Sequence, residues 1–225
     1  MPQLIFKDVT FHWPDGKGFS QVNFNLKPGD FAIITGPSGS GKSSLLRLLV
    51  RFAEPDEGQI IYEHKPLTDW QPTVLRRHIA LLQQSPIMGA TLLKDCLLLP
   101  FNFKGNKDLP LPSEEKIHKI LTDLQLEGLS LNTPSTNLSL GQKQRVALAR
   151  LLLLDCKILL LDEPTSSLDA ESRLATEHML EKLHKQGTTI IMVTHNTFSP
   201  PCFLARVCVA KQHPDGKITF YPKLS

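Results

Sequence analysis

The segment GPSGSGKS, from Gly36 to Ser43, combines glycines, a lysine and a serine at a spacing that can hold a polyphosphate. Glycines let backbone N–H groups turn toward phosphate oxygens, and the start of a following helix adds partial positive charge. Lys42 can bridge the outer phosphates, and the Ser43 hydroxyl can ligate Mg²⁺. The apolar run FAIIT precedes the segment and the helix-like KSSLLRLLV continues from it. This strand–loop–helix order predicts a nucleotide-phosphate site rather than an ordinary glycine-rich turn.

Two acidic residues end an apolar run further along the chain and supply the carboxylates that such a site needs. Asp162 and Glu163 directly follow the strand-like residues 158–161. A phosphate loop requires a carboxylate on the side of its metal ion, and we assign this role to Asp162. Glu163 would project toward the terminal phosphate, where a carboxylate can deprotonate the attacking water. An isolated Asp-Glu pair would indicate a solvated strand end, but its combination with the phosphate loop predicts nucleotide chemistry.

Alternating strand and helix patterns surround these residues and predict the sheet that must position them. Continuous apolar runs predict buried strands, and apolar residues at helical spacing predict helices. Because strands and helices alternate, the fold class is predicted as α/β with a mostly parallel sheet. The first two strands are expected to form an antiparallel edge around a turn, and the last two a closing hairpin. Strands are predicted at 4–13, 22–26, 31–35, 157–163, 188–195, 206–212 and 217–222, helices at 42–50, 140–154 and 170–186, and the turn at 15–18.

The middle of the chain has a different composition and is predicted to form a smaller α-helical lobe. Residues from about 86 to 136 are rich in Pro, Asn and Lys around one clear helix. Ser113 can cap this helix with its side-chain oxygen, and Glu114 and Glu115 favour the positive first turn. The predicted organisation is a single domain over 1–225, with a core of 1–85 and 156–225 and a lobe of 86–155.

The amino-acid composition limits the classes of binding partner and the cellular compartment that we expect. The chain has 225 residues, 41% of them apolar, and a formal net charge of +3. This small charge does not indicate a nucleic-acid binder, so no nucleic-acid partner is expected. The four cysteines have neither redox nor zinc spacing and are expected to be free thiols. No run approaches the roughly 20 apolar residues of a membrane helix, so we expect a cytoplasmic chain unless a partner holds it at a membrane.

The segment LSLGQKQR, from Leu138 to Arg145, is similar to the LSGGQ signature of the ATP-binding-cassette ATPases. The chain resembles this family over nearly its whole length, and its motifs follow the family order. Trp13 stands where the family places an aromatic residue against adenine. The run ending at Asp169 resembles the D-loop, and His195 resembles the switch histidine, which would hold the terminal phosphate and the attacking water.

A glutamine of the family's Q-loop type also follows from the resemblance. Gln83 and Gln84 both stand at the expected place. Gln84 is preferred because the family glutamine lies two residues before a proline, here Pro86. This residue would sense Mg²⁺ and water and connect the site to the helical lobe.

The resemblance implies a P-loop NTPase with a RecA-like core that hydrolyses ATP with Mg²⁺. It also implies a dimer, in which the phosphate loop of one subunit and the signature of the other bind the same ATP. The implied catalytic residues are Glu163, His195 and Gln84. The implied nucleotide contacts are Trp13, Gly36, Pro37, Ser38, Gly39, Ser40, Gly41, Lys42, Ser43, Ser44, Ser139, Gly141, Gln142 and Asp169. The implied metal ligands are Ser43, Gln84 and Asp162.

Three residues depart from the family pattern, and none removes a catalytic group. Leu140 replaces the first signature glycine, Ser44 replaces the usual threonine, and Asn196 stands where an aspartate is common. Ser44 keeps a hydroxyl and Asn196 keeps a polar side chain. Leu140 would be harmful only if its backbone required a positive φ, which a branched side chain tolerates poorly. An active ATPase is therefore expected.

The resemblance further implies a transporter motor that docks on a separate membrane-spanning permease, at the cytoplasmic face of the membrane, together with a second copy of the chain. Alternatives are a soluble ATPase of translation control or DNA repair and a regulatory module without turnover. The soluble class carries tandem cassettes or coiled-coil insertions, and neither is found in this sequence. The stretch after Gln84 resembles a small bacterial group of metal or iron exporters, but import and export both stay open. Candidate permease contacts, which could instead pack under the lobe, are Ile87, Met88, Leu92 and Leu93.

Overall fold

The computed structural model describes residues 3–89, 92–195, 205–213 and 218–222, which contain one ten-stranded sheet. The strand order is β5-β4-β1-β2-β10-β9-β3-β8-β7-β6. The last five strands in this order run parallel to one another. They are β9 (Arg206–Gln212), β3 (Phe31–Thr35), β8 (Thr189–Val193), β7 (Ile158–Asp162) and β6 (Ile79–Leu82). The predicted α/β class is confirmed.

The other side of the sheet is largely antiparallel, as predicted for the edge. β1 pairs antiparallel with both β2 and β4, and β4 pairs antiparallel with β5. β10 pairs antiparallel with β9, which confirms the predicted closing hairpin, and joins the two halves of the sheet through β2. The bounds are β1 (Leu4–His12), β2 (Gly18–Leu26), β4 (Glu57–Tyr62), β5 (Lys65–Pro66) and β10 (Ile218–Pro222).

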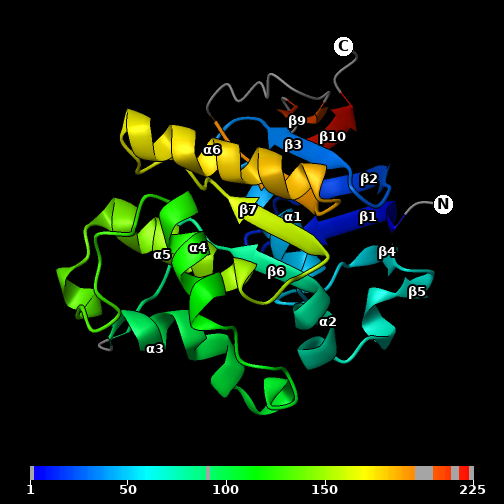
Figure 1. Cartoon of the computed structure of the whole chain (residues 1–225). Helices are drawn as coiled ribbons and strands as arrows, with labels where there is room; N and C mark the ends of the chain where they lie inside the picture. Colours follow the sequence, from blue (N-terminus) through cyan, green and yellow to red (C-terminus); the bar gives the residue numbers. More distant parts are fainter. Residues whose placement is uncertain (1–2, 90–91, 196–204, 214–217, 223–225) are drawn as a thin grey trace.

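Two hydrophobic cores lie on opposite faces of the parallel strands because successive side chains of a strand alternate between the faces. On one face, Ile34 and Leu160 pack in a cluster with the leucines of α1 (Lys42–Leu49). On the other face, Leu159 and Leu161 pack with residues of α6 (Ala170–Lys185). Figure 1 shows α6 lying across this second face. Burial on both faces explains why the strand segments are continuous apolar runs.

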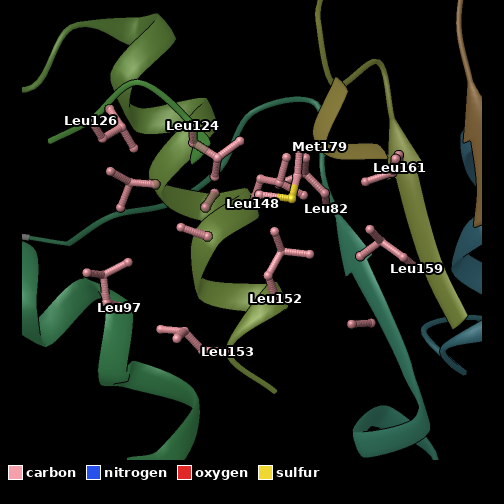
Figure 2. Close-up of a cluster of buried hydrophobic side chains, with 14 of the residues drawn as sticks. Leu82, Leu97, Leu124, Leu126, Leu148, Leu152, Leu153, Leu159, Leu161 and Met179 are labelled. Atoms are coloured by element: carbon pink, nitrogen blue, oxygen red, sulfur yellow. The ribbon is translucent and has the colours of Figure 1, made fainter. Parts of the chain in front are cut away.

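The chain between β6 and β7 supplies most of the remaining helices, drawn in green in Figure 1. Ser113 accepts a hydrogen bond from the backbone N–H of Lys116 at 3.2 Å, so the predicted cap of α4 is confirmed. Figure 2 shows how leucines of these helices meet Leu82, Leu159 and Leu161 of the sheet. The bounds are α3 (Leu93–Leu98), η2 (Leu99–Asn102), η3 (Lys104–Asn106), α4 (Glu114–Asp123), η4 (Ser135–Asn137) and α5 (Leu140–Leu152).

Two parts of the fold differ from the prediction. β2 begins at Gly18, which was assigned to a turn, because Gly18 pairs with His12; a Cβ there would lie 2.0 Å from the Phe11 carbonyl oxygen. The elements between α1 and Gln83 carry no strong periodicity and were not predicted. In addition to β4, β5 and β6, they are η1 (Leu67–Asp69) and α2 (Pro72–His78).

Candidate nucleotide-binding site

The predicted catalytic side chains follow neighbouring parallel strands at the edge where these strands end. Leu82 of β6 pairs with Leu161 of β7, and Asp162 pairs with Val193 of β8. Val193 in turn pairs with Ile34 of β3. The residues that follow these strand ends are Gln84 after β6, Glu163 after β7, His195 after β8 and the loop 36–41 after β3. In open α/β sheets, ligands bind outside this carboxyl edge.

The phosphate loop leads directly into α1, as predicted. Gly41 is the N-cap of α1 and has a φ of 78°, and a Cβ there would lie 2.7 Å from the Phe19 ring. Lys42 Nζ donates to the carbonyl oxygens of Pro37 at 2.7 Å and Gly36 at 3.0 Å. Burial lowers the pKa of Lys42, while Glu163 and Asp162 act in the opposite direction. The Lys42 ammonium group therefore donates to carbonyl oxygens of the loop in this structure. Phosphate oxygens of a bound nucleotide can replace these carbonyl oxygens as acceptors.

Ser43 and Asp162 form the pair that the metal role requires. Ser43 Oγ donates to Asp162 Oδ1 at 2.9 Å, across 119 residues of sequence. Asp162 is 7% exposed at the end of β7. A hydroxyl and a carboxylate oxygen that converge in this way are the hard oxygen ligands that Mg²⁺ prefers. Two of the three predicted Mg²⁺ ligands, Ser43 and Asp162, therefore converge in the structure.

Glu163 and His195 lie in direct contact, which the sequence alone did not show. His195 Nε2 is 2.9 Å from Glu163 Oε1. Glu163 has a φ of 51°, and its N–H donates to the Val193 carbonyl oxygen at 2.9 Å. Positive φ is rare for a glutamate, and the hydrogen bond to β8 stabilises it here. The chain therefore leaves the direction of β7 at Glu163. Asn196 lies outside the described residues.

The other predicted contacts near this edge are placed with varying strength. Gln84 is exposed just past β6, while Gln83 lines a groove described below. Trp13 is half-buried, and its Nε1–H donates to Ser44 Oγ at 3.0 Å. Gln84 is therefore open to solvent, whereas Trp13 is already held against the start of α1.

The signature residues open α5, and a capping box orders them. Ser139 Oγ accepts from the Gln142 N–H at 3.2 Å, and Gln142 Oε1 accepts from the Ser139 N–H at 2.9 Å. A Cβ on Gly141 would lie 3.3 Å from Leu168 of the D-loop. Asp169 caps α6 by accepting from the Ser172 N–H at 2.9 Å, and this bond lowers the pKa of Asp169.

The structure does not bring the signature to the phosphate loop of its own chain. Among the residues that are described, no hydrogen bond joins Ser139, Gly141 or Gln142 to residues 36–44. The start of α5 nevertheless has backbone N–H groups of the kind that can bind an anion. The phosphate loop and the signature are therefore two separate candidate half-sites of one chain.

Replacing Leu140 by glycine is expected to change ATPase activity only a few fold. Leu140 is the first residue of α5 with ordinary helical backbone, and its side chain is 61% exposed. The strain that a positive φ would cause is therefore absent at this position, and the helix N–H groups need no particular side chain here. Steady-state ATPase rates check this expectation. A hundredfold rise from a near-zero rate would instead identify a crippled natural signature.

A groove of about 640 Å³ opens between α2, β6 and the lobe helix α5. Its lining includes the large exposed side chains of Phe52 (55% exposed), Ile87 (79%) and Phe103 (56%). The cationic side chains at the groove are Arg76 and Arg150. The sequence signal for this groove was only Ile87, because the other groups come from separate segments.

Two of the four predicted permease contacts were wrong. Met88 is 7% exposed and Leu93 is fully buried, and both belong to the core cluster beneath the lobe. Only Ile87 and Leu92, at 79% and 40%, present an apolar surface. Leu92 is exposed and Leu93 is buried because α3 begins at Leu93, whose side chain belongs to the same core cluster as Cys96 and Leu97.

Comparison with known protein families identifies the family of the chain. The family described as ABC transporter matches residues 19–166. The chain belongs to the ABC transporter family. It is an ATP-binding subunit of this family, and its enzymatic activity is ATP hydrolysis. The transporter prediction is confirmed, the alternative of a soluble ATPase is not favoured, and the relatives do not specify an exporter type.

Relatives of this ABC subunit come from several organisms. The chain is 36% identical over 197 residues to ABC transporter I family member 17 of Arabidopsis thaliana, covering 87% of this chain and 73% of the relative. It is 33% identical to the energy-coupling factor transporter ATP-binding protein EcfA of Methanocaldococcus jannaschii, covering 94% and 76%. The sulfate/thiosulfate import protein CysA of Synechocystis is 36% identical, and the chain spans only 54% of its length.

Solved structures of ABC proteins share the fold. CbiO1 from Clostridium perfringens, described as part of the transporter complex cbiONQ, superposes with a TM-score of 0.77 at 29% identity, covering 96% of this chain and 86% of CbiO1. The ATP-binding cassette MJ0796, described as dimeric and bound to ADP and Pi, superposes with a TM-score of 0.80 at 29% identity, and the match covers 99% of both chains.

In the described part of this ABC chain, no helix has the length and apolar character to cross a membrane.

Proposed function

We propose that two copies of this chain close on two molecules of ATP and drive a separate membrane-spanning permease, with each copy forming a single domain of core (1–85, 156–225) and lobe (86–155). The observation that carries the proposal is the paired geometry of the carboxyl edge. Ser43 contacts Asp162 and Glu163 contacts His195, each at 2.9 Å. Asp162 of the metal-side pair and Glu163 of the base-side pair are therefore adjacent residues at the end of β7.

Each side chain has a defined task in hydrolysis. Ser43, Asp162 and Gln84 would hold Mg²⁺, which would supply positive charge against the terminal phosphates. Lys42 exchanges its loop carbonyls for phosphate oxygens. Glu163 accepts the proton of the attacking water, and His195, fixed by its contact with Glu163, holds the terminal phosphate in line with it.

The second half-site is completed by a partner copy. The start of α5 carries free N–H groups and an ordered Ser139, but it is not joined to the phosphate loop of its own chain. A γ-phosphate bound in one copy can satisfy this helix terminus in the other. The dimeric state described for MJ0796 supports this arrangement. ATP would then stabilise the dimer, and hydrolysis would weaken it.

The groove between α2, β6 and α5 is the proposed docking place for a cytoplasmic helix of the permease. Its aromatic and aliphatic side chains are unusually exposed for this chain, and two arginines stand beside them. An apolar helix face would bury Phe52, Ile87 and Phe103 from water. The description of CbiO1 as part of a transporter complex supports docking on other subunits of a transporter, and the proposal places this docking at the cytoplasmic face of the membrane.

Cysteines placed in the groove are expected to crosslink to a membrane-spanning protein. Ile87→Cys and Phe103→Cys in native membranes should capture one protein with several membrane spans, identified by mass spectrometry. The matched control is Leu174→Cys on α6, since Leu174 is similarly exposed at 55% but does not line the groove. Equal capture by the control would contradict docking in the groove. Failure of both groove variants in membranes that retain the chain would contradict the transporter role.

A further inference from the structure

The indole of Trp13 is attached to the phosphate-loop helix by a hydrogen bond. Trp13 follows β1 directly, and its Nε1–H donates to Ser44 Oγ at 3.0 Å, across 31 residues of sequence. Ser44 is the third residue of α1, next to the predicted metal ligand Ser43. The two elements are far apart in sequence, so this bond is a specific tertiary contact.

Packing restricts the same indole on its other sides. Its ring lies edge-on to Phe11, with ring centroids 6.3 Å apart, and to Phe19, with ring centroids 6.4 Å apart. A Cβ on Gly41 would lie only 3.1 Å from Trp13 Cζ2. The half-buried indole is therefore bordered by two aromatic rings and by the last residue of the phosphate loop, and Ser44 accepts the hydrogen bond of its N–H.

The chemistry of a hydroxyl lets Ser44 connect the two halves of a nucleotide site. A serine hydroxyl has one O–H to donate and two lone pairs that accept. When Ser44 accepts the indole N–H, its own O–H is still available for a phosphate oxygen. An indole N–H, in contrast, can only donate, so the orientation of the ring depends on an acceptor at this position.

We propose that Ser44 is a positioning residue, which holds the Trp13 indole in the orientation that stacks on the base of the bound nucleotide. The proposal rests on the proposed stacking of Trp13 on adenine and adds the residue that fixes it. It makes ATP affinity depend on Trp13 and Ser44 as a pair. Threonine at position 44 would keep the acceptor, whereas alanine would remove it.

The contact itself is tested without nucleotide by ¹⁵N NMR of the indole N–H groups. The chain has two tryptophans, so Trp70→Phe leaves Trp13 as the single indole signal. Ser44→Ala is expected to speed hydrogen exchange of this N–H and to move its resonance, and Ser44→Thr to restore both. An unchanged exchange rate and resonance in Ser44→Ala would overturn the proposal.

The role in binding is tested by a double-mutant cycle with Trp13→Phe, which keeps a ring but lacks the N–H. Ser44→Ala should weaken ATP binding about threefold to tenfold in the Trp70→Phe chain and clearly less when Trp13→Phe is also present. Tripolyphosphate, which has no base, should show no such coupling between the two substitutions. Equal effects in both backgrounds would overturn the positioning role and leave Ser44 as a phosphate contact only.

A separate variant tests the stacking on which the proposal rests. Trp13→Ala should weaken ATP binding but not tripolyphosphate binding. If this variant binds ATP as tightly as the wild type, stacking of the base on Trp13 is contradicted, and so is any role of Ser44 in it. Additivity in the cycle, with Trp13→Ala impaired, contradicts the positioning role alone.

Discussion

Glu163→Gln is expected to slow ATP turnover by about 10²- to 10⁴-fold while ATP still binds. The amide of glutamine cannot accept the proton of the attacking water, but its oxygen can keep the 2.9 Å contact that Glu163 makes with His195. The phosphate contacts of Lys42 and Ser43 are untouched. Hydrolysis therefore stops after the two copies have closed, and a stable dimer should accumulate. Steady-state ATPase rates and gel filtration with ATP and Mg²⁺ measure the two effects.

A matched surface substitution separates this effect from a general loss of charge. Glu54→Gln makes the same chemical change at a side chain that is 61% exposed and pairs only with Arg51 in the described structure. It should hydrolyse ATP at the wild-type rate and form no trapped dimer. If Glu163→Gln behaves like this control, Glu163 is not the general base.

Gly141→Asp is expected to abolish turnover although each copy still binds ATP through its own phosphate loop. The new carboxylate would stand in the first turn of α5, at the terminus that we propose faces the γ-phosphate bound to the partner copy. Its negative charge is favourable for the helix itself, so the fold should survive. The same charge repels the phosphate, and the added Cβ would lie 3.3 Å from Leu168 of the D-loop. ATPase assays, nucleotide titration and thermal unfolding distinguish these effects.

Gly128→Asp is the control for this substitution. A Cβ on Gly128 would meet nothing within 4 Å, and its backbone is not in the left-handed region. This variant should retain turnover and ATP-dependent dimer formation. Normal turnover in Gly141→Asp would remove the signature from its phosphate-binding role.

Much of the site could be predicted because its residues follow continuous apolar strands. The runs that became β3, β7 and β8 are buried on both faces, so their patterns are strong and their ends are marked by polar residues. Lys42, Asp162 and His195 could therefore be placed at one edge from the sequence. The closing hairpin and the cap at Ser113 were also local features with clear signals.

The features that were not predicted depend on contacts between distant segments. β4 reads as polar and exposed over its first half, and only its pairing with β1 makes it a strand. The contact of Trp13 with Ser44 and the groove beside Ile87 arise in the same way. Met88 and Leu93 were misplaced because an apolar side chain in a connecting segment gives no indication of its direction. Their burial is set by packing under the lobe.

The groove and the nucleotide edge share one strand, which has a thermodynamic consequence. The residues of β6 and the following Gln83 line the groove, and Gln84 is the next residue, so the groove and the nucleotide edge adjoin along one segment of the chain. If ATP changes the affinity of the groove for its occupant tenfold, linkage requires the occupant to change the affinity for ATP tenfold, about 1.4 kcal/mol in either direction. The strength of ATP binding would thus report whether the membrane partner is engaged.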